Sequence, residues 1–186
     1  MIAARQRKWL IPVALGILFF GGAPALSQLD YGFMPKGGKT LLLEVLGSPP
    51  DQQELRKIVE ARRSETEWRD AMSARGKALS ERELRTLAAY LAVNMPVPEE
   101  TRARPDFAAE LPRDGRELAW NECQSCHSLF SSHLTQDRDV QAWLNMFQSP
   151  FHRGLKMTAQ ERDEFARYST INMPMKIEDV PKDLRF

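Results

Sequence analysis

The sequence is poor in the residues that disulfide scaffolds and metal clusters use. Among 186 residues there are only two cysteines and three histidines. Two cysteines allow at most one disulfide, which excludes a disulfide scaffold. Three histidines are too few for a multi-copper or zinc catalytic site in addition to any other cofactor. The sequence also has no glycine loop for a nucleotide phosphate and no Ser-His-Asp order typical of hydrolases.

Neither sign of charge predominates. Lysine and arginine total 26, and aspartate and glutamate total 25, so the sequence lacks the basic excess typical of nucleic-acid-binding proteins. Hydrophobic residues make up 42% and charged residues 27%, which is the balance of a globular protein. We therefore expect a folded protein without a nucleic-acid partner.

Only one long apolar run is present, and it lies near the N-terminus. Three basic residues precede the twelve-residue run 9–20, and Ala23-Pro24-Ala25 follows it as a small-residue cleavage site. The run is short for a transmembrane helix, which needs about 20 apolar residues. The mean hydropathy of −0.45 excludes a polytopic membrane protein. We predict a signal peptide at residues 1–25 and a periplasmic location; cleavage after Ser27 and an uncleaved anchor are the alternatives.

The chemistry of the sequence is concentrated in the run Cys123-Gln124-Ser125-Cys126-His127. The spacing C-x-x-C-H is the attachment pattern of c-type haem. Two thiols on one turn can each form a thioether with a haem vinyl group, and the following imidazole then reaches the iron. The sequence therefore predicts one covalent haem c bound by Cys123 and Cys126, with His127 as the proximal iron ligand.

Three other chemistries are open to a C-x-x-C pair. A thioredoxin-like redox dithiol is disfavoured because a histidine follows directly and no βαβ pattern surrounds the motif. A structural disulfide suits an exported protein, but the short spacing strains it. A site for a bare metal ion is the third. Covalent haem is the preferred interpretation.

The residues before the motif are typical of a helix that leads into it. Asp114-Gly115 begins the pattern, which runs into Cys123 eight positions after the glycine. This arrangement resembles the first helix of class I cytochromes c, in which a glycine lets the last helix cross closely. The resemblance covers about residues 106–174, and the haem motif is its specific part. It implies an all-α haem domain.

The chain also contains an internal repeat. Residues 75–96 align with 153–174 without gaps, and eight of the 22 positions are identical. Each copy has a capping box, at 80–83 and 158–161, followed by apolar residues at helical spacing. Only the later copy has C-x-x-C-H, so the earlier one is interpreted as a cytochrome-like unit without haem. Two unrelated helices with similar caps are the alternative.

These patterns predict an all-α fold, with a cytochrome c-like haem domain preceded by a related helical unit without haem. The expected segments are a signal peptide at 1–25, an N-terminal extension at 26–47, a haemless unit at 48–98, a linker at 99–112 and a haem domain at 113–186. Within the extension, the apolar run 41–46 is ambiguous between a strand and a short helix.

The preferred sixth ligand of the iron is Met146. It lies 19 residues after His127 and ahead of the capped helix that starts at Thr158. The order of C-x-x-C-H, a tryptophan, a methionine and a capped helix resembles the haem subunits of periplasmic sulfite and quinohaemoprotein dehydrogenases. This resemblance implies Met146 as the distal ligand. A thioether ligand raises the reduction potential and suits electron transfer.

Several other side chains are alternatives for the distal position. Met173 belongs to an Asn-Met-Pro sequence that occurs in both copies, which favours a structural turn. His152 would give an iron with two histidine ligands. Met157, Met175, His133 and an open sixth position complete the set.

The function that these residues favour is periplasmic electron transfer. The protein would act as a carrier or as the cytochrome subunit of a dehydrogenase, with redox proteins as partners and no enzymatic chemistry of its own. The alternative is a haem enzyme or sensor whose sixth position binds peroxide or a gas, with His152 as its acid–base group. A third hypothesis is an assembly partner that only retains a haem. Contact with a membrane is expected only if the signal is uncleaved.

Overall fold

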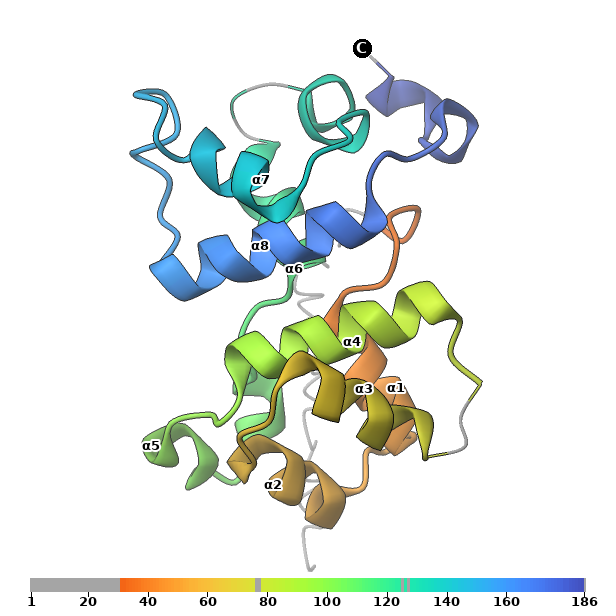
Figure 1. The fold of residues 1–186 in the computed structure, drawn as a ribbon, viewed down its shortest axis with the longest axis vertical. Coiled ribbons are helices and arrows are strands. Elements are labelled where there is room, and N and C mark those ends of the chain that lie inside the picture. The colour runs from red at the N-terminus through yellow and green to blue at the C-terminus, as the bar shows by residue number, and fades with distance from the viewer. Residues whose placement is uncertain (1–30, 76–77, 125, 127, 186) are drawn as a thin grey trace, which may run out of the picture. The chain divides into compact units, whose positions relative to one another are not determined.

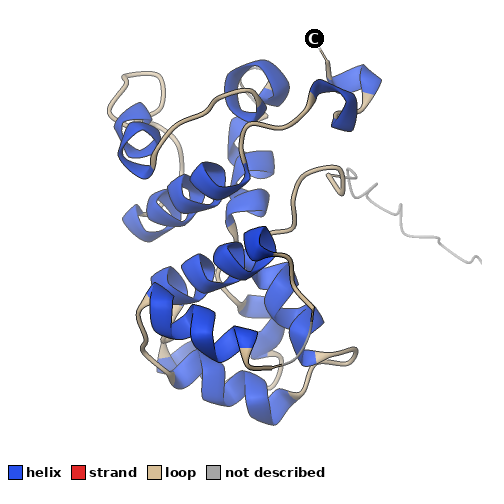
Figure 2. Ribbon diagram, turned by 45° about the vertical axis from the view of Figure 1, so that its right-hand side comes forward, coloured by secondary structure: helices blue, strands red, loops and turns tan. Residues whose placement is uncertain are grey.

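The structure is a computed structural model that describes residues 31–75, 78–124, 126 and 128–185. Within these ranges every regular element is helical, which confirms the all-α expectation (Figures 1 and 2). None of the described helices has the length and apolar character needed to cross a membrane. The expected signal peptide and the expected proximal ligand His127 lie outside the described residues.

Four helices, which we call the first copy, follow one another after residue 37. They are α1 (Gly38–Leu46), α2 (Gln52–Glu60), α3 (Glu65–Ser73) and α4 (Glu81–Asn94). Their apolar faces form one core, which includes the fully buried Leu41, Leu55, Trp68 and Leu87. The ambiguous run 41–46 is thus helical. Gly47 ends α1 with a φ of 97°, a conformation that favours glycine.

A second group of helices forms the second copy. It comprises α6 (Gly115–Leu118), the π-helical turns η2 (Ala119–Cys123) and η3 (Phe130–Leu134), α7 (Val140–Met146) and α8 (Ala159–Asn172). Two short helices connect the copies, α5 (Glu99–Arg102) and η1 (Phe107–Glu110), and two follow α8, η4 (Ile177–Asp179) and η5 (Lys182–Leu184). The second copy has its own core around Leu118, Trp143 and Phe165.

Capping boxes fix where four of the helices begin. The boxes predicted at the starts of α4 and α8 are confirmed, with a serine or threonine side chain and a glutamate bonded to each other's backbone N–H. Helices α3 and α6 have the same device, which the sequence analysis did not identify. Each box satisfies backbone donors that would otherwise have no partner in the first helical turn.

The two copies use the same close crossing of first and last helix. In the first copy, a Cβ placed on Gly38 would overlap the Cβ and Cγ of Tyr90 on α4. In the second copy, a Cβ on Gly115 would overlap the same two atoms of Tyr168 on α8. Both glycines are therefore required by close packing, and the repeat extends further back along the chain than residue 75.

The segment before the first helix of each copy contacts the last helix of the other copy. The Oη of Tyr90 in the first copy donates to the carbonyl oxygen of Pro112, just before α6, at 2.9 Å. The Oη of Tyr168 in the second copy donates to the carbonyl oxygen of Pro35, just before α1, at 2.7 Å. Met34 accordingly belongs to the second core. The two copies therefore hold each other at equivalent points.

Helices α4 and α8 pack against each other in antiparallel orientation (Figure 1). The Nδ2 of Asn94 near the end of α4 donates to Oε2 of Glu164 at 3.2 Å. The Nδ2 of Asn172 at the end of α8 donates to Oγ1 of Thr86 at 3.0 Å. These two bonds join equivalent positions of the repeat, so the interface has approximate two-fold symmetry.

Glu164 is a carboxyl group buried between the copies. Its Oε1 accepts a hydrogen bond from the backbone N–H of Gly115 at 3.0 Å, in addition to the bond from Asn94. Burial, together with the nearby Asp114 carboxylate, raises the pKa of Glu164 to about 8. The group is therefore mostly protonated at neutral pH.

The glycine crossings predict a pair of equivalent stability losses. Gly38→Ala and Gly115→Ala should each lower the free energy of unfolding by roughly 1–3 kcal/mol, because the added methyl group must displace a tyrosine. Gly154→Ala is the matched control, since its added Cβ would have no atom within 4 Å. Urea unfolding followed by circular dichroism measures all three. A stable Gly38→Ala variant would contradict the shared crossing.

Glu164 predicts a pH dependence of stability. At pH values between about 4.5 and 8, the unfolded chain releases a proton that folded Glu164 keeps, so the free energy of unfolding should fall as the pH rises. Glu164→Gln mimics the neutral acid and should flatten this decline, leaving a remainder from Asp114, whose pKa burial also raises. Glu99→Gln, the same substitution at an exposed position, is the control. Equal slopes in urea unfolding of the parent and the Gln variant would disprove the assignment.

Candidate functional site

A cavity of about 290 Å³ lies in the second copy and contains both cysteines. It is formed by the end of η2, the turn η3, the end of α7 and the loop between α7 and α8. Its lining consists of Glu122, Cys123, Cys126, Ser132, His133, Met146, Phe151, His152 and Leu155. The structure therefore brings the two cysteines together with three of the six side chains that the sequence offered for the distal position, Met146, His152 and His133.

The wall that carries the cysteines is fixed by the first helix of the second copy. Cys123 is the last residue of η2, which continues the helix that begins at Gly115. Arg113 secures this wall, because its guanidinium contacts Glu122 at 2.6 Å and Glu161 on α8 at 2.7 Å. The position of Cys123 thus depends on the contacts that join its helix to α8.

The electrostatics of Cys123 are unsuited to thiolate chemistry. Burial, with smaller contributions from Glu122 and Cys126, raises the pKa of the Cys123 thiol to about 12. A redox dithiol needs the opposite shift, because the thiolate is the reactive form. The environment therefore disfavours the thioredoxin-like alternative.

His133 is a buried histidine on the inner side of the cavity. Its ring centroid lies 4.9 Å from those of both Trp143 and Phe165, and its Nε2 lies 3.4 Å from Oγ of Ser169. Burial, with a smaller effect of the Arg138 charge, lowers the pKa of His133 to about 3, so the ring is neutral. Its Nδ1 has no hydrogen-bond partner among the described residues.

Met146 and His152 line the same cavity from the end of α7 and the loop after it. Met146 ends α7, and its side chain is half-buried. His152 lies in the loop after α7, and its Nδ1 is 3.1 Å from the carbonyl oxygen of Met146. A thioether and an imidazole, the two neutral side chains that most often complete haem coordination, therefore share one cavity.

The other methionine candidates lie elsewhere. Met173 caps the C-terminal end of α8 and is buried in the second core, as is Met157 before α8. The backbone N–H of Met175 donates to the carbonyl oxygen of Leu134 at 2.7 Å. None of these three side chains lines the cavity that contains the cysteines.

The lining residues fit a covalently attached haem. Both cysteines line the cavity together with the apolar side chains of Met146, Phe151 and Leu155, and Nδ1 of His133, another lining residue, has no hydrogen-bond partner among the described residues. The described residues contain no group of three or more histidine, cysteine, aspartate or glutamate side chains that could hold a bare metal ion.

The sequence analysis missed two features of this site. Phe151 lines the cavity yet is 92% exposed, and the ion pairs of Arg113 support the cysteine wall. The loop 147–158 has no periodic pattern, so nothing in the sequence places Phe151. The Arg113 pairs join residues far apart in the chain, and one sequence does not indicate such pairs.

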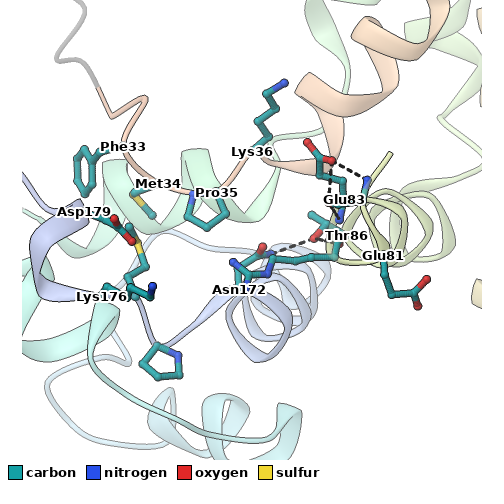
Figure 3. Close-up of a pocket in the computed structure, with 14 residues that line it drawn as sticks. Phe33, Met34, Pro35, Lys36, Glu81, Glu83, Thr86, Asn172, Lys176 and Asp179 are labelled. Atoms are coloured by element: carbon teal, nitrogen blue, oxygen red, sulfur yellow. Dashed lines mark hydrogen bonds between the residues drawn. The ribbon is translucent and has the colours of Figure 1, made fainter. Parts of the chain in front are cut away.

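A larger pocket, of about 780 Å³, lies between the segment before α1, the start of α4 and the segment after α8 (Figure 3). Two of its polar groups are engaged in structural bonds, Glu83 in the cap of α4 and Thr86 with Asn172 (Figure 3). The pocket lining combines acidic and basic side chains and includes no cysteine or histidine. We therefore place the candidate site at the smaller cavity.

Comparisons with known proteins found no matching family model, curated protein or solved structure.

The positions of the methionines predict different roles. Met173→Ala should lower the free energy of unfolding by roughly 2–5 kcal/mol, because it leaves a hole in the core. Met146→Ala should cost less, because its side chain is only half-buried and borders the cavity. Urea unfolding of both variants under identical conditions measures the difference. A larger loss for Met146→Ala would contradict these placements.

Proposed function

We propose that this protein is a c-type cytochrome that transfers electrons in the periplasm. The observation that carries the proposal is the single cavity in which Cys123 and Cys126 meet Met146 and His152. Thioether attachment needs both thiols on one wall, and electron transfer needs a neutral ligand facing them. Cys123 and Cys126, Met146 at the end of α7 and His152 in the next loop line one cavity, which supports both requirements.

The proposal gives a task to each residue of the candidate site. Cys123 and Cys126 hold the cofactor covalently, and His127 supplies the proximal nitrogen by its place in the motif. The haem supplies reversible one-electron chemistry of its iron. The buried side chains Trp143 and Phe165 keep water from the inner wall and hold His133 in a fixed, neutral position.

The arrangement of helices supports a cytochrome c-like fold for the second copy. A glycine in the helix that leads to the cysteines packs directly on a tyrosine of the last helix, as the resemblance to class I cytochromes c implies. The same crossing at Gly38 and Tyr90 supports a common origin for the first copy. When Gly38 is aligned with Gly115, residues 46–50 stand at the place of the cysteine motif, and α2, which follows them, contributes Leu55, Ile58 and Val59 to the first core.

The edge of the cavity suits brief contact with another redox protein. Cys126 is exposed, and Phe151 projects into solvent with 92% of its surface exposed. Redox complexes are short-lived and bury little surface, commonly less than about 1,200 Å². Redox proteins, including a periplasmic dehydrogenase, are therefore the proposed partners. A filled sixth position favours an electron carrier over a haem enzyme or sensor.

Covalent attachment predicts a loss of haem in cysteine variants. The full chain, expressed with a c-type maturation system, should give a periplasmic band that keeps haem peroxidase stain on a denaturing gel. Cys123→Ala with Cys126→Ala should abolish the stain, because no thioether can form. Gly154→Ala, at an open position, should stain like the parent. Full stain in the double variant would refute the proposal.

A further inference from the structure

His152 is held in the orientation that metal-binding histidines adopt. Its Nδ1 lies 3.1 Å from the carbonyl oxygen of Met146. A carbonyl oxygen only accepts hydrogen bonds, so Nδ1 carries the proton and donates. Histidine ligands of metals almost always donate from one ring nitrogen to a carbonyl or carboxylate and bind with the other. In His152, Nε2 is therefore the nitrogen suited to bind iron.

The loop around His152 is fixed by its own backbone bonds. The N–H of His152 and that of Arg153 donate to the carbonyl oxygen of Ser149 at 3.0 and 3.1 Å, and the N–H of Leu155 donates to that of His152 at 3.2 Å. The guanidinium of Arg153 also donates to the carbonyl oxygen of Gln148 at 3.0 Å. The ring thus has a defined position at the cavity and needs no rearrangement of an extended loop.

The two competing side chains are less suitable. Met146 packs its side chain partly against the second core, and its carbonyl oxygen holds His152. His133 lies close to Trp143 and to Phe165, and its Nε2 is directed to Ser169, so the packing restricts its movement toward an iron. Ser169 Oγ donates to the carbonyl oxygen of Phe165, so it accepts from Nε2–H of His133, and Nδ1 of the neutral ring can only accept a hydrogen bond.

We propose that His152, through Nε2, is the sixth ligand of the haem iron, and that the Met146 carbonyl is the group that positions it. This inference rests on the proposed function and replaces Met146 as the preferred ligand. An imidazole lacks the potential-raising effect of a thioether. The protein is then a bis-histidine cytochrome of low potential, suited to receive electrons from strongly reducing donors.

The test uses the purified full chain with its haem attached. The ferric absorption spectrum should be low-spin and should lack the weak long-wavelength band of methionine–iron coordination. His152→Ala should convert it to a high-spin spectrum, and added imidazole should restore the low-spin form. Met146→Leu removes the competing thioether but keeps the side-chain volume and the backbone carbonyl, and its ferric spectrum should stay low-spin. Gly154→Ala, at an open position, is the control.

A second variant keeps the test decisive if His152→Ala folds poorly. His152→Met should remain low-spin, gain the long-wavelength band and raise the reduction potential. The inference is overturned if Met146→Leu becomes high-spin while His152→Ala stays low-spin, or if His133→Leu becomes high-spin. Haem stain on a denaturing gel separates the two claims. A parent chain without covalent haem defeats the proposed function, whereas stained protein with an unaltered His152→Ala spectrum defeats only the ligand assignment.

Discussion

The fold depends on two buried tyrosines that each serve both copies. The rings of Tyr90 and Tyr168 pack directly on glycines of their own copies, and their phenol groups donate to prolines that precede the first helix of the other copy. Burial raises the pKa of both phenols well above the ordinary value, so the hydroxyls remain donors at any physiological pH. One side chain therefore sets a helix crossing within a copy and a connection between copies.

Tyr168 lies on α8, and this helix also borders the candidate site. The helix presents Phe165 and Ser169 to His133, and Glu161 near its start binds Arg113, which also binds Glu122 beside Cys123. A shift of α8 would therefore move the inner wall and the cysteine wall together. Because α8 lies antiparallel to α4 and shares buried hydrogen bonds with it, the copy without cysteines helps to fix the geometry of the cavity.

Local features of the sequence were sufficient for much of this structure. The all-α class follows from helical periodicity, and the starts of α4 and α8 follow from capping boxes. The cavity contains Met146, the distal ligand that the sequence preferred, and its alternative His152, but the sequence did not show that the His152 ring bonds to the backbone carbonyl of Met146. The sequence also could not predict that the segments before α1 and α6 contact the other copy, since these hydrogen bonds join residues far apart in the chain.

The buried polar groups explain why the first copy is retained without cysteines. If α4 were removed, the Glu164 carboxyl would lose Asn94, and Asn172 would lose Thr86. Both side chains would then face solvent on a helix that must hold the cavity. Removing α4 would also expose the face of α8 that packs against it, and apolar surface there would lose its partner. In this structure the first copy therefore acts as a fixed half of the interface, and its apolar core around Leu55 gives α4 the support that a bound cofactor would otherwise provide.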